Sequence, residues 1–188
     1  MAAVDLRSLI TKLDDPCRKA LEAAAGLTLS RTHYNVEIEH YLLKLLDIQG
    51  GDFEACLKHY GVDEGVLAAD LNRVLDRLKT GNSRPPALAP QIVSLIKEAW
   101  LIGSLGENAG KVRSGHLLAA LLSDEYKSFP TLYRSLVTER NRRWVPQIEK
   151  LLKDKENYFV VVGALHLVGD GGLLELMKRD GFKAEQLN

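Results

Sequence analysis

One eleven-residue pattern occurs twice in this chain of 188 residues, and it constrains the fold more than any other feature. The first copy is VEIEHYLLKLL at residues 36–46, and the second is VRSGHLLAALL at residues 112–122. Aligning His40 with His116 also brings a valine and three leucines into register. Apolar residues at this spacing indicate an amphipathic helix in each copy. The repeat therefore predicts a duplicated helical fold, in which each half buries its apolar face against the other.

Hydrophobic spacing and capping residues predict further helices around the two copies. Pro16 opens an alanine-rich helix, because proline is tolerated in the first helical turn. Asn35, Asp63 and Ser114 are expected to cap the helices that follow them. The segment KTGNSRPPALAP, residues 79–90, is expected to be the linker between the halves. The expected helices of this region cover residues 5–13, 16–29, 36–49, 52–60, 63–78, 91–105 and 114–122.

The character of the chain changes after about residue 126. Residues 130–152 keep helical spacing, interrupted by Pro146, whereas NYFVVVGALH at residues 157–166 is a β-branched and aromatic run that predicts a buried strand. A helix over residues 171–180 and a strand over residues 182–187 complete the prediction. The expected fold class is mainly α, with a pseudo-duplicated helical domain over residues 1–126 and a short α/β extension over residues 127–188.

Composition excludes several classes of partner. The 25 basic and 25 acidic side chains balance, so bulk charge predicts neither a nucleic acid nor an anionic membrane as partner. No apolar run is long enough to cross a bilayer, and the opening MAAVDLRSLITKLDD carries charges where a signal peptide would be apolar. Cys17 and Cys56 match no metal or redox spacing, which predicts a reduced, cytoplasmic protein.

Two patterns could carry chemistry, and neither completes a known motif. The loop GENAGK places glycines before a lysine, but Leu105 replaces the glycine that a phosphate-binding loop requires and Val112 replaces its Ser or Thr. The five histidines form no HExxH motif and no Cys/His cluster, so His40 and His116 are expected to be equivalent core or capping residues. A Ser/His/Asp triad stays open, because its members need not be adjacent in sequence. No cofactor is predicted.

The leucine and alanine stripes are expected to be mostly core, but the seam between two helical halves could accept an amphipathic helix from a partner. The two histidine-leucine-leucine segments, joined by a proline-bearing linker, resemble the Clp amino-terminal domain family. The stretches LRSLITKLDDPCRKALEAAAGL, GDFEACLKHYGVDEGVLAADLNRVLDRL and AWLIGSLGENAGKVRSGHLLAALLSD resemble the ClpV type, which belongs to AAA+ ATPases of bacterial type VI secretion. This resemblance covers about residues 1–126.

The resemblance implies a recognition domain that binds the amphipathic N-terminal helix of a contracted-sheath subunit in a hydrophobic groove and targets the sheath for disassembly. The implied groove involves the first helix and the helix after Pro16. Its candidate residues are Leu6, Leu9, Ile10, Leu13, Leu21 and Ala24. The ATPase modules are absent from the sequence, so we expect a non-catalytic chain that is monomeric by itself, whereas the parent ATPase would be hexameric.

The carboxyl-terminal residues resemble a different family. ERNRRWVPQIEKLL at residues 139–152 and YFVVVGALHLVGDGGLLELMKRDGF at residues 158–182 are similar to the end of the TraB/GumN family, whose members include metal-dependent hydrolases. That family has two Gly-x-x-His motifs and an acidic residue, of which this chain offers one match, ending at His166. The resemblance makes His166 a candidate metal ligand and a hydrolase fragment the alternative function. A strand-end histidine in a loop, and a purely structural adaptor, are the remaining interpretations.

Overall fold

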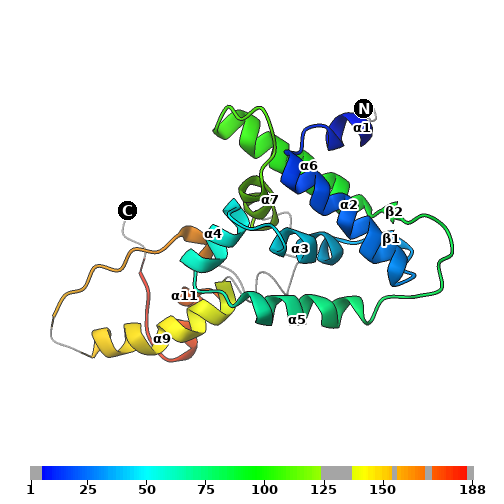
Figure 1. Cartoon of the computed structure of the whole chain (residues 1–188). Coiled ribbons are helices and arrows are strands. Elements are labelled where there is room, and N and C mark those ends of the chain that lie inside the picture. Colours follow the sequence, from blue (N-terminus) through cyan, green and yellow to red (C-terminus); the bar gives the residue numbers. More distant parts are fainter. Residues whose placement is uncertain (1–5, 124–136, 154–155, 168–170, 186–188) are drawn as a thin grey trace. The chain divides into compact units, whose positions relative to one another are not determined.

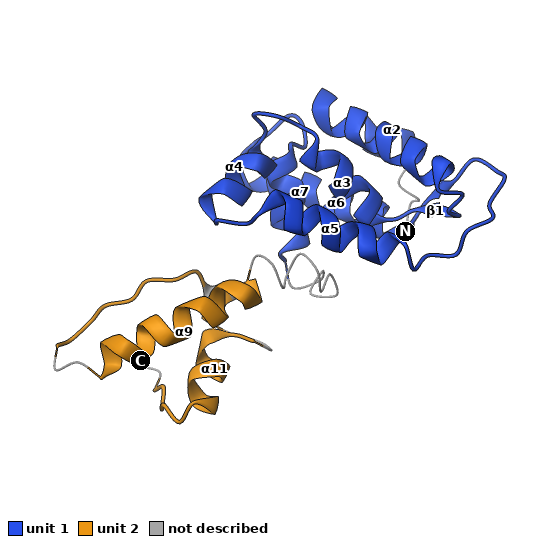
Figure 2. Cartoon of the chain, turned by 60° about the horizontal axis from the view of Figure 1, so that its bottom comes forward, with its two compact units in different colours: residues 1–129 blue, residues 130–188 orange. Residues whose placement is uncertain are grey.

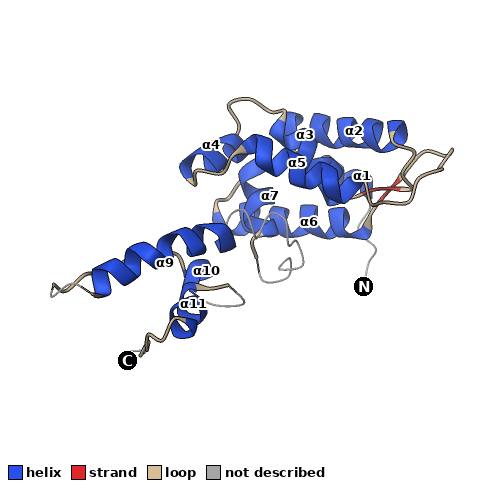
Figure 3. Ribbon diagram, turned by 90° about the horizontal axis from the view of Figure 1, so that it is seen from below, coloured by secondary structure: helices blue, strands red, loops and turns tan. Residues whose placement is uncertain are grey.

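The computed structural model describes residues 6–123, 137–153, 156–167 and 171–185 (Figure 1). The chain divides into two compact units, Met1–Phe129 and Pro130–Asn188 (Figure 2). Helices dominate both units, and the strands drawn in Figure 3 are two short ones in the first unit. The predicted fold class, mainly α, is confirmed.

The first unit is a bundle of helices with a small parallel sheet. Its strands β1 (Asn35–Val36) and β2 (Ala87–Leu88) pair residue for residue, Asn35 with Ala87 and Val36 with Leu88. Its helices are α1 (Leu6–Ile10), α2 (Asp15–Ser30), α3 (Ile38–Leu46), α4 (Asp52–His59), α5 (Glu64–Leu75), α6 (Pro90–Leu101) and α7 (Ser114–Leu121), and the π-helix η1 (Ile102–Gly106) continues α6.

The predicted duplication appears as two equivalent helix pairs, because α2 packs on α3 and α6 packs on α7. The segments that precede these helices cross between the halves. The strand before α3 pairs with the strand before α6, and the Asp14 N–H, just before α2, donates to the Val112 carbonyl before α7 over 2.9 Å. Val112 in turn donates to the Lys12 carbonyl over 2.8 Å. Each half therefore depends on backbone hydrogen bonds from the other.

The core of the first unit consists of the apolar faces of these helices, as the helical spacing predicts. Burying one leucine or isoleucine side chain stabilises the fold by roughly 1.5–3 kcal/mol. Asp14 and Asp63 start α2 and α5 by accepting hydrogen bonds from the Cys17 and Val66 N–H groups, each over 2.9 Å. Side chains with no more than 1% exposure include Val36, Ile38, Tyr41, Leu42, Leu45, Phe53, Leu57, Leu67, Leu71, Leu75, Ile92, Leu95, Ile96 and Leu117.

Two of the expected caps are wrong. Asn35 lies in β1, and α3 begins after Glu37. Ser114 is the first residue of α7 rather than its cap, and its Oγ accepts a hydrogen bond from the Phe53 N–H over 3.1 Å. In both helices the histidine at the third helical position instead accepts a hydrogen bond from the backbone N–H of the residue that precedes the helix.

The second unit is smaller and has its own apolar cluster. Its helices are α9 (Glu139–Leu152), which contains Pro146, α10 (Ala164–Leu167) and α11 (Leu173–Arg179). Val145, Leu173 and Met177 are buried together, with Trp144, Ile148, Val162, Leu167, Leu176 and Phe182 packed around them. The helix expected over residues 130–152 begins in the described part at Glu139, and residues 130–136 lie outside the described residues.

The strand expected over residues 157–166 is wrong. Residues 157–163 have no regular secondary structure, and residues 164–167 form α10. β-Branched and aromatic residues favour a strand only where a neighbouring strand supports them, and within the described part of this unit there is none. The strand expected over residues 182–187 is likewise absent from residues 182–185, while residues 186 and 187 lie outside the described residues.

Candidate functional site

An apolar groove lies between α1 and α6, which pack side by side. Its volume is about 400 Å³, and its walls are mostly apolar. The lining residues are Ser8, Leu9, Lys12, Lys97, Trp100 and Leu101. Grooves of this kind accept the apolar face of a helix or an extended peptide.

The end of α1 is fixed to the second half of the bundle. The Lys12 ammonium lies 4.4 Å from the centroid of the Trp100 ring, a cation–π contact of about 0.5–1 kcal/mol at an exposed site. The Lys111 ammonium donates to the Thr11 carbonyl over 2.6 Å. The contact between Lys12 and Trp100 joins the two walls of the groove, and Leu101 is 49% exposed at its edge.

The six residues predicted for the groove divide between surface and core. Leu9 lines the groove although it is only 4% exposed, Leu6 is exposed and Ile10 is partly buried on the same short helix. Leu13, Leu21 and Ala24 lie in the core, with no more than 5% exposure.

The groove also contains residues that sequence reasoning missed, on α6. Trp100 and Leu101 come directly after the last buried residue of that helix. They are two adjacent large apolar residues outside its buried face, and this was the sequence signal that could have identified them.

The two repeat histidines are structural caps, as predicted. The Nδ1 atoms of His40 and His116 accept hydrogen bonds from the Glu37 and Arg113 N–H groups, over 3.0 and 3.1 Å. Both side chains are buried. Burial lowers the pKa of His40 to about 4, and the nearby charges of protonated His33 and of Arg31 act in the same direction. Neither histidine has the surroundings of a metal ligand, since no group of three His, Cys, Asp or Glu residues that could hold an ion occurs in the described ranges.

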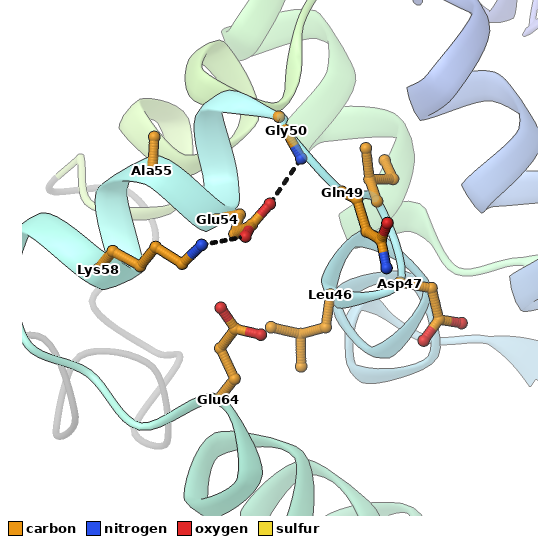
Figure 4. A pocket seen from close by; sticks show the side chains of 10 residues that line it. Leu46, Asp47, Gln49, Gly50, Glu54, Ala55, Lys58 and Glu64 are labelled. Atoms are coloured by element: carbon orange, nitrogen blue, oxygen red, sulfur yellow. Dashed lines mark hydrogen bonds and ion pairs between the residues drawn. The ribbon is translucent and has the colours of Figure 1, made fainter.

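A larger and more polar cleft, of about 680 Å³, lies between the end of α3, α4 and the start of α5 (Figure 4). The Glu54 carboxylate there accepts hydrogen bonds from the Gly50 N–H, over 2.6 Å, and from the Lys58 ammonium. The hydrogen bond from Lys58 lowers the pKa of Glu54. Because the charges of this pair are satisfied within the chain, the apolar groove is the better candidate for binding a partner.

The second unit buries His166 in a network of neutral groups. The amide of Asn141 donates to the His166 and Gly171 carbonyls over 3.1 and 2.8 Å. Its Oδ1 atom is therefore an acceptor, and the His166 Nδ1–H donates to it over 2.8 Å. Burial lowers the pKa of His166, and the positive charge of Arg140 lowers it further.

The described residues do not fit a complete metal site at His166. None of the described residues joins it in a group of three potential ligands. His166 lies in α10, so the alternative of a strand-end histidine is wrong.

Known proteins resemble this chain over most of its length. The AAA+ ATPase ClpV1 of Pseudomonas aeruginosa is 30% identical over 122 residues, which are 65% of this chain and 14% of that protein. The solved N-domain of ClpV from Vibrio cholerae superposes with a TM-score of 0.65 and 31% identity, covering 80% of this chain and 92% of that one. The sequence profile of the TraB/PrgY/gumN family matches residues 57–186. The chain belongs to the ClpV N-domain family and, over residues 57–186, to the TraB/PrgY/gumN family.

A further solved structure is a complex of a ClpV N-domain with a VipB peptide, with a TM-score of 0.61 and 30% identity. The match covers 80% of this chain and 94% of that one. The ClpV N-domain is thus a binding domain in that complex. Because the present chain spans 14% of the curated ClpV1 relative, the activity of the whole ATPase does not carry over with the resemblance.

No helix in the described part of the chain is both long enough and apolar enough to cross a membrane.

Proposed function

We propose that this chain is the substrate-recognition domain of a ClpV-type ATPase and binds an amphipathic helix of a type VI sheath subunit in the groove between α1 and α6. The observation that carries the proposal is the apolar groove itself, lined by Leu9, Trp100 and Leu101. The similarity to a ClpV N-domain in complex with a VipB peptide supports it. In such docking, apolar side chains at helical spacing on the peptide enter the groove and supply most of the affinity.

The charge at the edge of the groove favours a ligand that carries carboxylates beside its apolar face. Lys12 and Lys97 are exposed members of the groove lining. A helix that buries its apolar face between α1 and α6 would bring its flanking residues to these ammonium groups. Carboxylates at those positions would fix the register of the helix, while contributing less to affinity than the apolar contacts.

The proposed role involves binding without chemistry. The domain would hold a sheath subunit in the cytoplasm so that ATPase modules can disassemble the contracted sheath. The groove offers two lysines, a serine and apolar side chains, and lacks the acid and base pairs that hydrolysis needs.

The proposal is tested by binding a fluorescent N-terminal peptide of the sheath subunit and following its anisotropy. Leu101→Asp places a charge at the edge of the groove, and we expect binding to weaken by at least about tenfold, or 1.4 kcal/mol. Leu105→Asp is the matched control, because Leu105 is 82% exposed on η1 and does not line the groove. A folded wild-type chain that fails to bind, or equal binding by both variants, would contradict the proposal.

A further inference from the structure

Two buried histidines meet where the linker between the halves joins the first half. The Nδ1 atom of His33 and the Nε2 atom of His40 are 2.8 Å apart, and both residues are at most 3% exposed. The Glu37 N–H donates to Nδ1 of His40 over 3.0 Å, so neutral His40 carries its proton on Nε2 and donates it to Nδ1 of His33. Neutral His33 then carries its own proton on Nε2. The backbone and the two rings thus form a chain of hydrogen bonds that runs in one direction.

This chain of hydrogen bonds has no place for an additional proton. The ring nitrogens without a proton are the two Nδ1 atoms, and each already accepts a hydrogen bond. Protonation of His33 sets its Nδ1–H against the Nε2–H of His40. Protonation of His40 sets its Nδ1–H against the Glu37 N–H, and a change of tautomer only moves the conflict from one contact to the other. An extra proton therefore breaks one of two buried hydrogen bonds.

The backbone around the same histidine holds the linker. The Asn82 N–H donates to the Thr32 carbonyl over 2.9 Å, and the side-chain amide of Asn82 donates to the His33 carbonyl over 3.1 Å. Further along the linker, strands β1 and β2 pair (Figure 1). The Ala89 N–H then donates to the Val36 carbonyl over 3.1 Å. The position of the linker therefore depends on the segment that carries His33.

We propose that the pair of His33 and His40 is an acid-sensitive latch for the linker. An added proton breaks the pair, and the linker then detaches from the segment around His33 while the helices of the first unit stay folded. The linker contacts lie outside the helices, since α2 ends at Ser30, α3 begins at Ile38 and α6 begins at Pro90. A local opening of this kind requires less free energy than unfolding of the whole unit.

The charges beside the pair largely balance one another. Arg31 and Asp76 form an ion pair over 3.0 Å, and they act in opposite directions on the pKa of His33. Glu37 and Lys79, also of opposite sign, line a cavity of about 270 Å³ together with His33. Burial is the largest effect, and it lowers the pKa of both histidines below the ordinary 6.5. The latch is therefore closed at neutral pH and opens in acid.

The helices packed around the pair do not supply a ready counter-charge for a protonated histidine. On α5, which packs on α3, Asp70 is already paired with Arg73 over 2.5 Å. On α3 itself, burial raises the pKa of Glu39, so this carboxylate resists ionisation. The extra proton on the pair is therefore not stabilised by a new ion pair in the closed state.

Hydrogen exchange of the full chain at pH 7 and pH 5 tests the latch, with protection factors that remove the intrinsic pH dependence of exchange. Because opening takes up a proton, the open population rises by up to about tenfold for each pH unit between the ordinary pKa and the lowered one. We expect the protection of the Asn82 and Ala89 amides to fall by about tenfold. Leu71 and Leu95, in the cores of α5 and α6, should stay at least about tenfold better protected at pH 5, because they exchange only through larger openings.

Variants that keep the hydrogen bonds but cannot take the proton separate the latch from general acid effects. In His33→Asn, Oδ1 replaces Nδ1 as the acceptor for His40, and one titrating group is lost. This variant should retain at least about threefold more protection of Asn82 and Ala89 at pH 5 than the wild type. The double variant His33→Asn/His40→Gln should show no pH dependence there. His59→Gln is the control, because His59 is exposed, and it should behave as the wild type.

Three results would overturn the proposal. The first is equal protection of the Asn82 and Ala89 amides at pH 7 and pH 5 in the wild type. The second is a fall of Leu71 and Leu95 to the same level, which would mean that the whole unit unfolds. The third is the full wild-type loss in folded His33→Asn, a single variant that decides the matter even if the double variant does not fold; circular dichroism shows which variants are folded. The latch is independent of the groove, so failure of either proposal leaves the other standing.

Discussion

At the scale of single residues, the two repeat histidines explain how a duplicated sequence starts two equivalent helices. Because each Nδ1 accepts a backbone N–H, each neutral ring carries its proton on Nε2. In the first half the Nε2–H group of His40 donates to Nδ1 of His33 over 2.8 Å. In the second half the Nε2–H group of His116 donates to the Glu107 carboxylate over 3.1 Å. Both halves therefore use a histidine as a helix cap, but the group that accepts the hydrogen bond from its Nε2–H differs.

The burial of His40 predicts that acid destabilises the fold. The pKa of His40 is about 4 in the folded chain against an ordinary 6.5, so between these values the unfolded chain binds the proton more readily. Stability is therefore complete above about pH 6.5 and falls as the pH drops towards 4, by on the order of 3 kcal/mol. Urea denaturation across this range measures the loss.

His40→Gln should flatten that dependence, because the amide does not titrate there and its oxygen can accept the Glu37 N–H. His59→Gln is the control, since His59 is exposed, and it should keep the slope of the wild type. An unchanged slope in His40→Gln would show that other groups cause the acid sensitivity.

At the scale of elements, the π-helix η1 allows α6 to end in close contact with α7. The Ser104 hydroxyl donates to the Trp100 carbonyl over 2.6 Å, and the Ala109 N–H donates to the Gly103 carbonyl over 2.9 Å. A Cβ atom on Gly103 would lie 2.9 Å from the His116 ring. Glycine is therefore required where η1 meets the capping histidine.

Gly103→Ala is expected to destabilise the first unit by about 1–3 kcal/mol, because the methyl group would force the His116 ring out of its cap. Gly106→Ala is the matched control on the same element, since no atom lies within 4 Å of its Cβ position. Thermal unfolding of both variants measures the difference. Equal melting temperatures would mean that the ring moves aside without cost.

Helix positions followed from the sequence, but the residues that line the groove between α1 and α6 did not, apart from Leu9. Spacing, Pro16 and Asp63 locate α2 and α5 because these signals act within one helix. Leu9 and Leu13 share the same apolar stripe and are both buried, yet Leu9 lines the groove whereas Leu13 pairs with Val112. That choice depends on a backbone contact between distant segments, which periodicity does not report. The failed strand at residues 157–163 has the same origin, since a strand needs a partner that no local pattern supplies.

At the scale of the whole molecule, the groove is a product of the duplication. One wall comes from α1, before the first repeat, and the other from α6, in the second. The bridge between Leu13 and Val112 holds α1 to the second half. Neither half could form the groove alone, so recognition depends on the complete first unit.

The same reasoning predicts that the second unit is dispensable for binding the sheath peptide. Every lining residue of the groove lies in the first unit, which has its own buried core. A chain that ends at residue 129 should unfold cooperatively and bind the peptide with the Kd of the full chain. Thermal unfolding and peptide anisotropy of the two lengths compare these properties. Tighter binding by the shorter chain would indicate that the second unit competes with the peptide for the groove, and weaker binding by a folded shorter chain would mean that the ligand also contacts the second unit.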